Sequence, residues 1–265
     1  MAKTILITGA TDGIGFETAK LLVTEGHHIL LHGRSDKKLA KTKAELLKLD
    51  TNAQVETYKA DLSLVSDVET LAKEISANHQ KLDVLINNAG VYSIADPITE
   101  EGLDARFAVN TIAPYLLTKR LLPLMNAEGR VVNLSSAAQA PVDLHALAGR
   151  VRLNDGLAYA QSKLALTMWN NNLAKTIGSQ GPVVVAVNPA SMLGSKMVKE
   201  AYGVSGGDLR IGADILVRAA LSDEFANASG KYFDNDSGRF ASPHADALND
   251  EKCAEVTHAI ERVLK

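Results

Sequence analysis

Tyr159 and Lys163 are the residues whose types and spacing most directly suggest chemistry. They lie four positions apart in a stretch, residues 157–167, that is predicted to be helical, and positions i and i+4 of a helix share one face. A phenol alone loses its proton only near pH ~10, whereas a nearby ammonium stabilises the phenolate and lowers that pKa. The pair therefore predicts a group that exchanges a proton with a substrate. The same spacing also fits a surface tyrosine beside a solvated lysine.

Glycines recur directly after the first predicted strand. The loop Gly9-Ala-Thr-Asp-Gly13-Ile-Gly15 lies between a strand at residues 3–8 and a helix at residues 16–26. Glycines allow a phosphate to approach the backbone, and the helix N-terminus supplies free N–H groups. A tight turn between strand and helix would also need glycine, and the spacing is wider than Gly-x-Gly-x-x-Gly. Its position at the first strand–helix junction favours a nucleotide site.

The end of the second predicted strand bears on which nucleotide binds. In NAD-binding folds this position usually carries a carboxylate that binds the ribose hydroxyls, and residues 31–35 contain none. Arg34 offers a planar cation suited to a 2′-phosphate, with the Ser35 hydroxyl beside it. NADP(H) is therefore the predicted cofactor, and NAD(H) is the alternative. Asp12 is a mild counter-signal, because a second cation in the glycine loop would suit NADP better.

Strands alternate with helices along almost the whole chain. This alternation predicts an α/β fold with one doubly wound parallel sheet of about seven strands and helices on both faces. No linker or repeat divides the sequence, so we expect a single domain over residues 1–265, with loops at about 137–156 and 189–208 beside the site. We expect strands at 3–8, 28–31, 55–59, 82–86, 130–134 and 183–187, with a last edge strand at 230–233. Helices are expected at 16–26, after Ser35, at 65–77, at 101–125 with an interruption at Pro114, and at 159–177, 211–221 and 251–264.

Composition narrows the classes of function. The chain has 265 residues, of which 46% are hydrophobic and 22% charged, with a net charge of −3. This balance predicts an ordinary globular protein that binds neither nucleic acid nor a membrane. Cys253 is the only cysteine, and we saw no signal-peptide pattern, so the cytoplasm is the expected location. The seven histidines have no metal-ligand spacing, and no metal is expected.

Several short motifs follow one another along the chain: Thr8-Gly-Ala-Thr-Asp-Gly-Ile-Gly15, Asp61-Leu62, Asn87-Asn-Ala-Gly90, Asn110, Ser135-Ser136 and Tyr159-x-x-x-Lys163. In these motifs and their order, the sequence resembles the short-chain dehydrogenase/reductase family over nearly its whole length. The resemblance implies a Rossmann fold and oxidoreductase activity, and the Gly33-Arg34 pair resembles the family's NADP-preferring pattern.

The resemblance implies a role for each matching residue. Tyr159 would be the general acid/base, and Lys163 would hold the nicotinamide ribose and lower the pKa of Tyr159. Ser136 would hydrogen-bond the substrate oxygen; the resemblance favours it over Ser135 because it matches the second of the family's paired serines, and a one-residue shift on a strand turns the side chain to the other face. Asn110 would anchor a water that relays protons through Lys163. The other implied cofactor contacts are Gly9, Thr11, Asp12, Gly13, Ile14 and Gly15 at the pyrophosphate, Arg34 and Ser35 at the 2′-phosphate, Asp61 and Leu62 at the adenine, Asn87, Ala89 and Gly90 behind the adenosine half, and Pro189 and Ser191 near the nicotinamide.

Two features refine the resemblance. The long span from Ser136 to Tyr159 and the ending Gly230-Lys-Tyr-Phe resemble the retinol-dehydrogenase-like branch. Membrane members of that branch carry an N-terminal anchor that we expect to be absent here, so retinoid activity is not implied. At residues 188–191, Ala190 replaces the family's usual glycine, and Ser191 or Ser195 would have to supply the hydroxyl for the carboxamide. The apolar residues expected along the substrate pocket are Val91, Tyr92, Leu193, Met197 and Tyr202.

The predicted function is interconversion of a carbonyl and an alcohol on a small to medium, largely apolar substrate with NADP(H). One alternative is the same chemistry with NAD(H). Another is a non-catalytic NADP-binding sensor, which would need no proton relay, and a methyltransferase would leave Tyr159 and Lys163 unexplained. The resemblance also implies a homodimer or homotetramer, paired through the helices predicted at 101–125 and 160–177.

Overall fold

Eight short segments pair into one sheet in the order β3-β2-β1-β4-β5-β6-β7-β8. The computed structural model describes the backbone of residues 1–265 and all side chains except those of residues 201 and 202. Adjacent strands are parallel from β3 to β7, and β8 is antiparallel to β7. The strands are β1 (Thr4–Ile7), β2 (His28–Gly33), β3 (Val55–Lys59), β4 (Val84–Asn87), β5 (Arg130–Leu134), β6 (Val183–Asn188), β7 (Tyr232–Asp234) and β8 (Arg239–Ala241).

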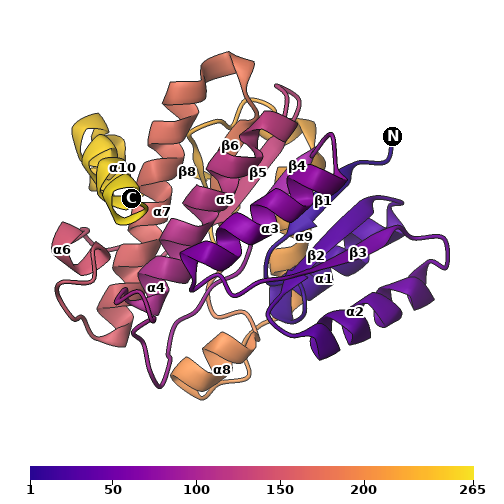
Figure 1. Cartoon of the computed structure of the whole chain (residues 1–265), viewed down its shortest axis with the longest axis horizontal. Coiled ribbons are helices and arrows are strands. Elements are labelled where there is room, and N and C mark those ends of the chain that lie inside the picture. Colours follow the sequence, from indigo (N-terminus) through magenta and orange to yellow (C-terminus); the bar gives the residue numbers. More distant parts are fainter.

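Helices cover both faces of the sheet (Figure 1). One apolar core joins the sheet to α1 (Gly13–Thr24), α2 (Asp36–Leu49) and α9 (Leu209–Leu221). A second core joins the other face to four longer helices and to two short ones described below, so the predicted doubly wound α/β architecture is confirmed. Those four are α3 (Val65–Asn78), α5 (Ala113–Leu121), α7 (Asp155–Ile177) and α10 (Asp250–Val263). Single 3-10 turns cover Leu122–Leu124, Gly178–Gln180, Asp223–Phe225 and Ala245–Leu248.

The strand order reverses between β1 and β4, which are neighbours in the sheet although β2 and β3 lie between them in sequence. Ligands of open α/β sheets bind outside the carboxyl ends of the strands at such a switch point. Here the two loops that follow β1 and β4 touch, because Asn88 Nδ2 donates to the carbonyl oxygens of Thr8 (2.8 Å) and Gly9 (3.1 Å). The fold therefore brings the glycine loop and the Asn87–Gly90 segment together.

The sheet has one strand more than predicted, and the segment at 230–233 is not the edge. The extra strand, β8, pairs with β7 through a turn that includes Gly238 with φ of 67°. Three residues are too few for an alternating pattern to be read from sequence. β7 is thus an interior strand, and β8 forms the edge.

The helix predicted over 101–125 is three pieces. It begins only at Ala105, with α4 (Ala105–Phe107), continues through a π-helical turn (Ala108–Ile112), and then becomes α5. The change of helix type precedes Pro114, which lies in the first turn of α5 and is tolerated there. A π turn inserts one residue into the helical ladder and is set by tertiary contacts rather than by periodicity.

Both predicted loops contain short helices. Within 137–156, α6 (Leu144–Leu147) is capped by Asp143, whose carboxylate accepts from the N–H groups of His145 and Ala146, and α7 already begins at Asp155. The second loop contains α8 (Lys196–Tyr202), as expected. Tyr202 was expected to face the pocket, but its side chain lies outside the described residues.

The face of α7 expected to pair with another subunit is covered within the chain. α10 packs against α7 (Figure 1). Tyr115 donates to Glu261 of α10 (2.7 Å), and Asn171 of α7 donates to the Ala247 carbonyl just before α10 (2.8 Å). Residues 161–170 are buried throughout. α10 therefore covers part of the apolar surface of α7 that suggested pairing between subunits, and the rest of the helix packs on the sheet and the π-helical turn.

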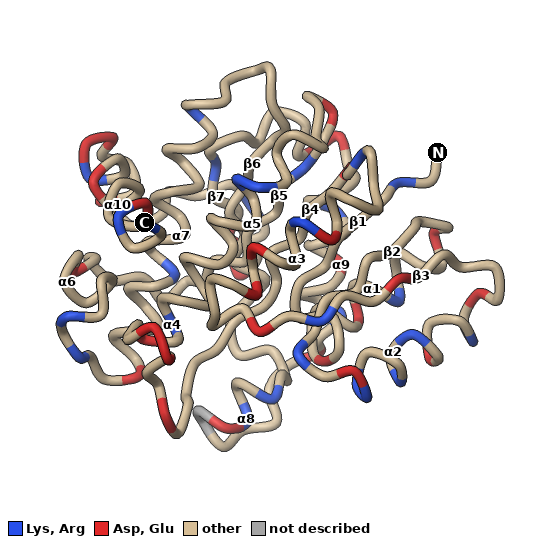
Figure 2. Tube along the Cα trace, viewed as in Figure 1, with Lys and Arg blue, Asp and Glu red and all other residues tan. Residues whose placement is uncertain are grey.

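Charges of both signs are interspersed along the chain, as the blue and red segments of α2 show (Figure 2). The sequence of that helix contains several lysines together with Asp36 and Glu45. In the described part of the chain, no helix combines the length and apolar character needed to cross a membrane. The described residues also contain no group of three or more His, Cys, Asp or Glu side chains placed to hold a metal ion.

Candidate active site

Tyr159 and Lys163 lie on one face of α7, near its N-terminus. The helix starts cleanly because Asn154 caps it, accepting from the Leu157 N–H. Lys163 Nζ lies 5.7 Å from the centroid of the Tyr159 ring and donates to the Leu134 carbonyl at the end of β5 (2.7 Å). Lys163 is buried, and burial lowers its pKa to about 8. The half-buried phenol and the buried amine thus form the arrangement that their spacing predicted.

The paired serines after β5 differ in surroundings. Ser135 is buried, and its hydroxyl shares a hydrogen bond of 2.7 Å with Thr167 of α7. Ser136 is half-buried, and its Oγ accepts from the Ala138 N–H (3.1 Å). Because Oγ accepts this bond, its hydrogen remains able to point to a substrate oxygen. The exposure of the two side chains favours Ser136 for substrate contact.

Asn110 connects the π-helical turn to two other segments. Its Oδ1 accepts from the Val91 N–H (2.8 Å), while Nδ2 donates to the Val91 carbonyl and to Ser162 Oγ, both at 3.0 Å. A Cβ built on Gly90 would lie 3.5 Å from both Asn110 Oδ1 and Lys163 Nζ. Asn110 is thus beside Lys163, with its amide bonded to protein atoms. The predicted water relay through Asn110 stays a prediction.

The glycine loop has the backbone geometry expected of a phosphate cradle. Gly9 and Gly13 have φ of 65° and 56°, which side-chain-bearing residues rarely adopt. A Cβ on Gly15 would meet the Gly9 carbonyl oxygen at 2.6 Å, so α1 approaches the strand as closely as glycine allows. Asp12 caps α1 by accepting from the Gly13 N–H (2.7 Å), so its carboxylate occupies a donor that we expected to serve a pyrophosphate.

Two other loop residues pack against neighbouring elements. A Cβ on Gly33 would lie 2.7 Å from the Thr11 methyl group, and one on Gly212 of α9 would lie 3.1 Å from Ile14 Cδ1. The Thr11 methyl group and the Ile14 side chain therefore help to position the loop.

His32 is a residue of this region whose role the sequence did not suggest. The Gly9 N–H donates to His32 Nδ1 (3.1 Å), so Nε2 carries the proton and donates to the Ala60 carbonyl (3.1 Å). Burial lowers the pKa of His32 to about 4, which keeps the ring neutral. The imidazole therefore links the glycine loop to the end of β3. Its place directly after the apolar strand predicted at 28–31 was the available signal.

The residues predicted to bind the 2′-phosphate and the adenine lie together after β2 and β3. Arg34 is 69% exposed, and its Nη1 lies 3.8 Å from Asp61 Oδ2. Ser35 caps α2 by accepting from the Lys38 N–H (3.4 Å). The other oxygen of Asp61 accepts from the backbone and hydroxyl of Ser63 (2.9 and 2.7 Å). Leu62 is buried in the core.

The segment after β4 divides between core and site. Asn87, the last residue of β4, is buried. Its Nδ2 donates to Thr118 (3.1 Å) and to Asn133 of the neighbouring strand β5 (2.8 Å). Its side chain thus supports the sheet. A Cβ on Gly9 would lie 2.9 Å from Ala89 Cα, so Ala89 lies directly against the glycine loop.

The segment after β6, where Pro189 and Ser191 were predicted to lie near the nicotinamide, is hydrogen-bonded to the β7–β8 turn. Ser191 donates from both its hydroxyl (2.6 Å) and its backbone N–H (2.7 Å) to Asp236. The hydrogen of this hydroxyl is therefore used within the protein. The Pro189 carbonyl accepts from Asn235 (3.0 Å). Ala190 has φ of 114°, a backbone conformation that favours glycine. The β7–β8 turn, which the sequence did not indicate, supplies these partners.

The start of α8 closes over the glycine loop. A Cβ built on Gly13 would lie 3.9 Å from Ser195 Cβ, and one on Gly90 would lie 3.8 Å from Met197 Cε. Leu193 is buried, whereas Met197 reaches the site as expected.

A polar hollow of about 340 Å³ opens beside Ser136. It lies between the strand end and the β7–β8 hairpin, where Tyr232 donates to the Ser136 carbonyl (3.1 Å). The hairpin was not among the segments expected to line the site. The lining residues are Ala137, Gln139, Tyr232, Asp234, Asp236, Ala241, Ser242, Pro243 and His244.

Comparison with known proteins places this fold and site in one class. The model of the short chain dehydrogenase family matches residues 3–203. Retinol dehydrogenase 12 of Mus musculus is 34% identical over 87% of this chain and 77% of that protein. The short-chain dehydrogenase TIC 32 A, chloroplastic, of Brassica napus is 32% identical over 87% and 79%. The chain belongs to the short-chain dehydrogenase/reductase family, in its retinol-dehydrogenase-like branch, and is an oxidoreductase.

Solved structures agree with this assignment. A protein of Mycobacterium paratuberculosis superimposes with a TM-score of 0.82 at 25% identity, covering 99% of this chain and 93% of that one. The angucycline C-6 ketoreductase LanV with bound NADP gives a TM-score of 0.70 at 27% identity, covering 88% and 93%. The resemblance and the Rossmann fold inferred from sequence are thus confirmed.

Proposed function

We propose that the protein interconverts a carbonyl and an alcohol with NADP(H), with Tyr159 as the proton donor. The observation that carries the proposal is the Tyr159–Lys163 pair on α7, whose ammonium lies against Gly90 and donates to the Leu134 carbonyl at the end of β5, two residues before Ser136. A protein that only binds NADP needs no proton donor beside the cofactor. The pair therefore favours a catalytic function over the alternative of a non-catalytic NADP-binding sensor.

The residues at the switch point fit a dinucleotide. Gly9 and Gly13 adopt positive φ, and Gly15 allows α1 to approach closely, which suits a pyrophosphate at the helix N-terminus. Lys163, with Nζ near Gly90, would hold the nicotinamide ribose, and Arg34 would bind a 2′-phosphate. For the pyrophosphate to use the Gly13 N–H, the Asp12 carboxylate would turn away. NADP in structural relatives such as the LanV ketoreductase supports this choice.

The nicotinamide, when bound, supplies or accepts the hydride. Tyr159 would give its phenol proton to the carbonyl oxygen, and the Lys163 ammonium would stabilise the phenolate left behind. Ser136 would donate its hydroxyl hydrogen to the same oxygen and so fix its direction. Oxidation would use the same groups in reverse, and reduction is the direction we favour in the cell.

The substrate in this proposal is a small to medium molecule with an apolar body, held between the segments at 137–156 and 189–208. Tyr92 and Met197 would supply apolar surface near Tyr159 and Gly90. The polar hollow beside Ser136 could receive a hydroxyl or carbonyl at the far end of the substrate. We place the enzyme in the cytoplasm, where its buried Cys253 would stay reduced. Any homodimer or homotetramer would use surfaces other than the face of α7 that α10 covers.

Tyr159→Phe tests the proposal. We expect turnover of carbonyl substrates to fall at least ~100-fold, because the proton donor is removed, while NADPH affinity, measured by fluorescence titration, changes little. Tyr58→Phe on β3 is the matched control and should leave turnover unchanged. Unchanged turnover in Tyr159→Phe would refute the assigned role.

A further inference from the structure

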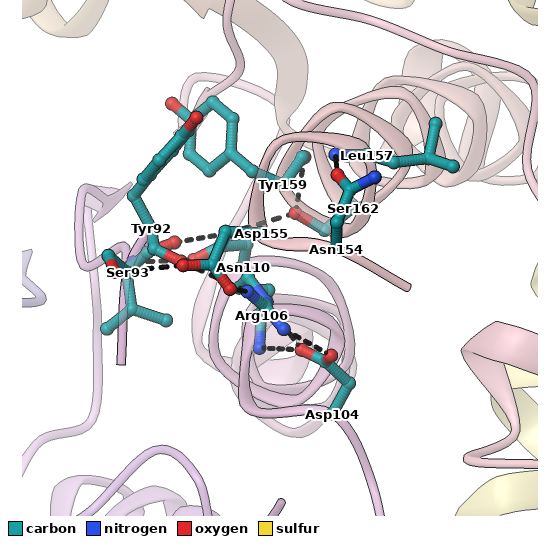
Figure 3. A network of polar contacts seen from close by, with 11 residues as sticks. Tyr92, Ser93, Asp104, Arg106, Asn110, Asn154, Asp155, Leu157, Tyr159 and Ser162 are labelled. Atoms are coloured by element: carbon teal, nitrogen blue, oxygen red, sulfur yellow. Dashed lines mark hydrogen bonds and ion pairs between the residues drawn. The ribbon is translucent and has the colours of Figure 1, made fainter. Parts of the chain in front are cut away.

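Arg106 is a buried arginine that joins three segments around Tyr159 (Figure 3). Its side chain is only 1% exposed. Nε and Nη2 donate to the two carboxylate oxygens of Asp104 (2.8 and 2.6 Å), and Nη1 donates to Asp155. Such a two-pronged bond fixes the plane of the guanidinium. The third donor is therefore held in a defined direction, toward the start of α7.

Asp155 carries the connection into α7. It is the first residue of that helix, one turn before Tyr159. Its Oδ2 accepts from the hydroxyl of Ser93 (2.9 Å) in the segment after β4. The neighbouring Tyr92 ring packs on the Tyr159 ring, with centroids 5.0 Å apart. The carboxylate thus links Arg106, the segment after β4 and the first turn of α7.

A second connection joins the π-helical turn to α7 on the other side of Tyr159. Asn110, four residues after Arg106, donates to Ser162 Oγ (3.0 Å), and the Ser162 hydroxyl donates to the Tyr159 carbonyl (2.7 Å). Asp155 precedes Tyr159 by four residues and Ser162 follows it by three. Tyr159 therefore lies between two points at which α7 is bonded to the α4 and π-turn stretch.

The energetics favour a geometric role for this network. Removing an arginine from water is costly, and a buried ion pair often stabilises a fold no more than apolar residues of similar volume would. Its hydrogen bonds are, however, directional and leave few alternative positions for the groups they join. The hydrogen bond from Arg106 also holds the pKa of Asp155 below its usual range, so the carboxylate stays charged at neutral pH.

We propose that Arg106, acting through Asp155, is a positioning residue that holds the first turn of α7 so that the Tyr159 phenol lies against Lys163. This inference rests on the proposed function, in which Tyr159 is the proton donor. Asp104 orients Arg106, and Asp155 transmits that orientation to the helix. The two bonded points flanking Tyr159 are the observation that carries it.

The test uses Asp155→Asn. The Asp155 side chain is 46% exposed, and the substitution keeps its size and leaves the Arg106–Asp104 pair intact, so the fold should persist. The matched control is Asp250→Asn. Asp250 is likewise the first residue of a helix, and it pairs with Lys175 at the opposite end of α7, far from Tyr159. Asp155→Glu is the conservative variant that keeps the carboxylate.

The readout is the ultraviolet absorbance of phenolate as a function of pH, for each protein with and without Tyr159→Phe. The difference between the two curves isolates the pKa of Tyr159 and needs no substrate. If Tyr159 moves away from Lys163, its pKa should rise by about one unit in Asp155→Asn. It should return partly in Asp155→Glu and stay unchanged in Asp250→Asn. An unchanged pKa would overturn the proposal, and so would a lowered one, which the loss of a negative charge alone would produce.

Kinetics give a second, separate check. With NADPH and a carbonyl substrate, Asp155→Asn should lower kcat about 10-fold, because small displacements of a reacting group are costly, with KM for NADPH unchanged. The limb of the kcat–pH profile set by Tyr159 should move to higher pH, whereas a merely destabilised protein would lose rate equally at every pH. Turnover that survives Tyr159→Phe would refute the proposed function. The absorbance titration is independent of that result, because it measures whether Arg106 and Asp155 position Tyr159.

Discussion

Arg34 is the residue on which the choice between NADPH and NADH depends in this account. Its guanidinium is largely exposed and is 3.8 Å from the Asp61 carboxylate, so it is held near the adenine side of the site without being buried there. Contact with a 2′-phosphate would replace a weak surface ion pair with a stronger charge-assisted bond.

Arg34→Asp should weaken NADPH binding roughly 10- to 100-fold and shift preference toward NADH, since a carboxylate there can accept from the ribose hydroxyls. Paired fluorescence titrations with NADPH and NADH measure this. Arg239→Asp, at an exposed position of β8, is the control. An unchanged ratio of the two affinities would remove Arg34 from cofactor choice.

Lys163 makes stability depend on pH. Burial lowers its pKa to about 8 from an ordinary value of 10.5, so above pH 8 the folded protein binds fewer protons than the unfolded chain. The free energy of unfolding should therefore rise with pH between these two values, by about 3 kcal/mol in total.

Urea unfolding at about pH 7 and about pH 10, without cofactor, checks this prediction. The wild type should gain stability relative to Lys163→Met as pH rises, and it should show no such gain relative to Lys48→Met, which removes an exposed lysine. A constant difference between wild type and Lys163→Met would show that Lys163 does not titrate in this range.

Some residues of the site could be identified from the sequence, and others could not. Tyr159, Lys163 and the glycines were found because helical spacing and turn chemistry are local properties. His32, Asn88 and Arg106 were missed, because their partners are far away in the sequence and no local pattern announces them. Arg106 stands in a mostly apolar stretch between Leu103 and Ile112, which was the one hint that it is buried.

At the scale of elements, the segment that leads from β6 to α8 contains backbone strain. Ala190 has φ of 114°, a conformation that costs an alanine on the order of 1–2 kcal/mol and glycine almost nothing. The sequence showed the substitution of the usual glycine, but it could not show that Ala190 would adopt a positive φ. Contacts of Pro189 and Ser191 with the β7–β8 turn explain why the backbone stays there.

Ala190→Gly should stabilise the protein by about 1 kcal/mol, after allowing for the extra freedom that glycine gives the unfolded chain. Ala226→Gly is the control, because Ala226 is exposed with φ of −58°, and this change should destabilise slightly. Thermal unfolding of both variants measures the effect. Equal destabilisation by the two would contradict strain at Ala190.

Whole elements were predicted according to how much of their pattern is local. β1 to β6 and helices α1, α2, α3 and α7 were anticipated from apolar runs and periodicity. The π turn after α4 and the three-residue β8 were not, because one depends on tertiary contacts and the other is too short to show alternation. The π turn matters for the site, since it places Asn110 beside Lys163.

For the whole molecule, the alternation of strands and helices was enough to predict the doubly wound sheet. Which segments pack over α7 and over the site could not be predicted in the same way. The apolar pattern of α7 is the same whether another subunit or α10 covers it, and only the folded chain shows that α10 does. The β7–β8 hairpin likewise enters the site from a segment that carried no motif.

The measurement that tests the central claim most directly is a titration of the purified protein with NADPH and with NADH, followed by nicotinamide absorbance in the presence of a panel of carbonyls. The panel should include an apolar aldehyde such as retinal and polycyclic ketones, as the names of the relatives suggest. We predict tighter binding of NADPH and turnover of at least one carbonyl. Failure to bind either nucleotide would contradict the account.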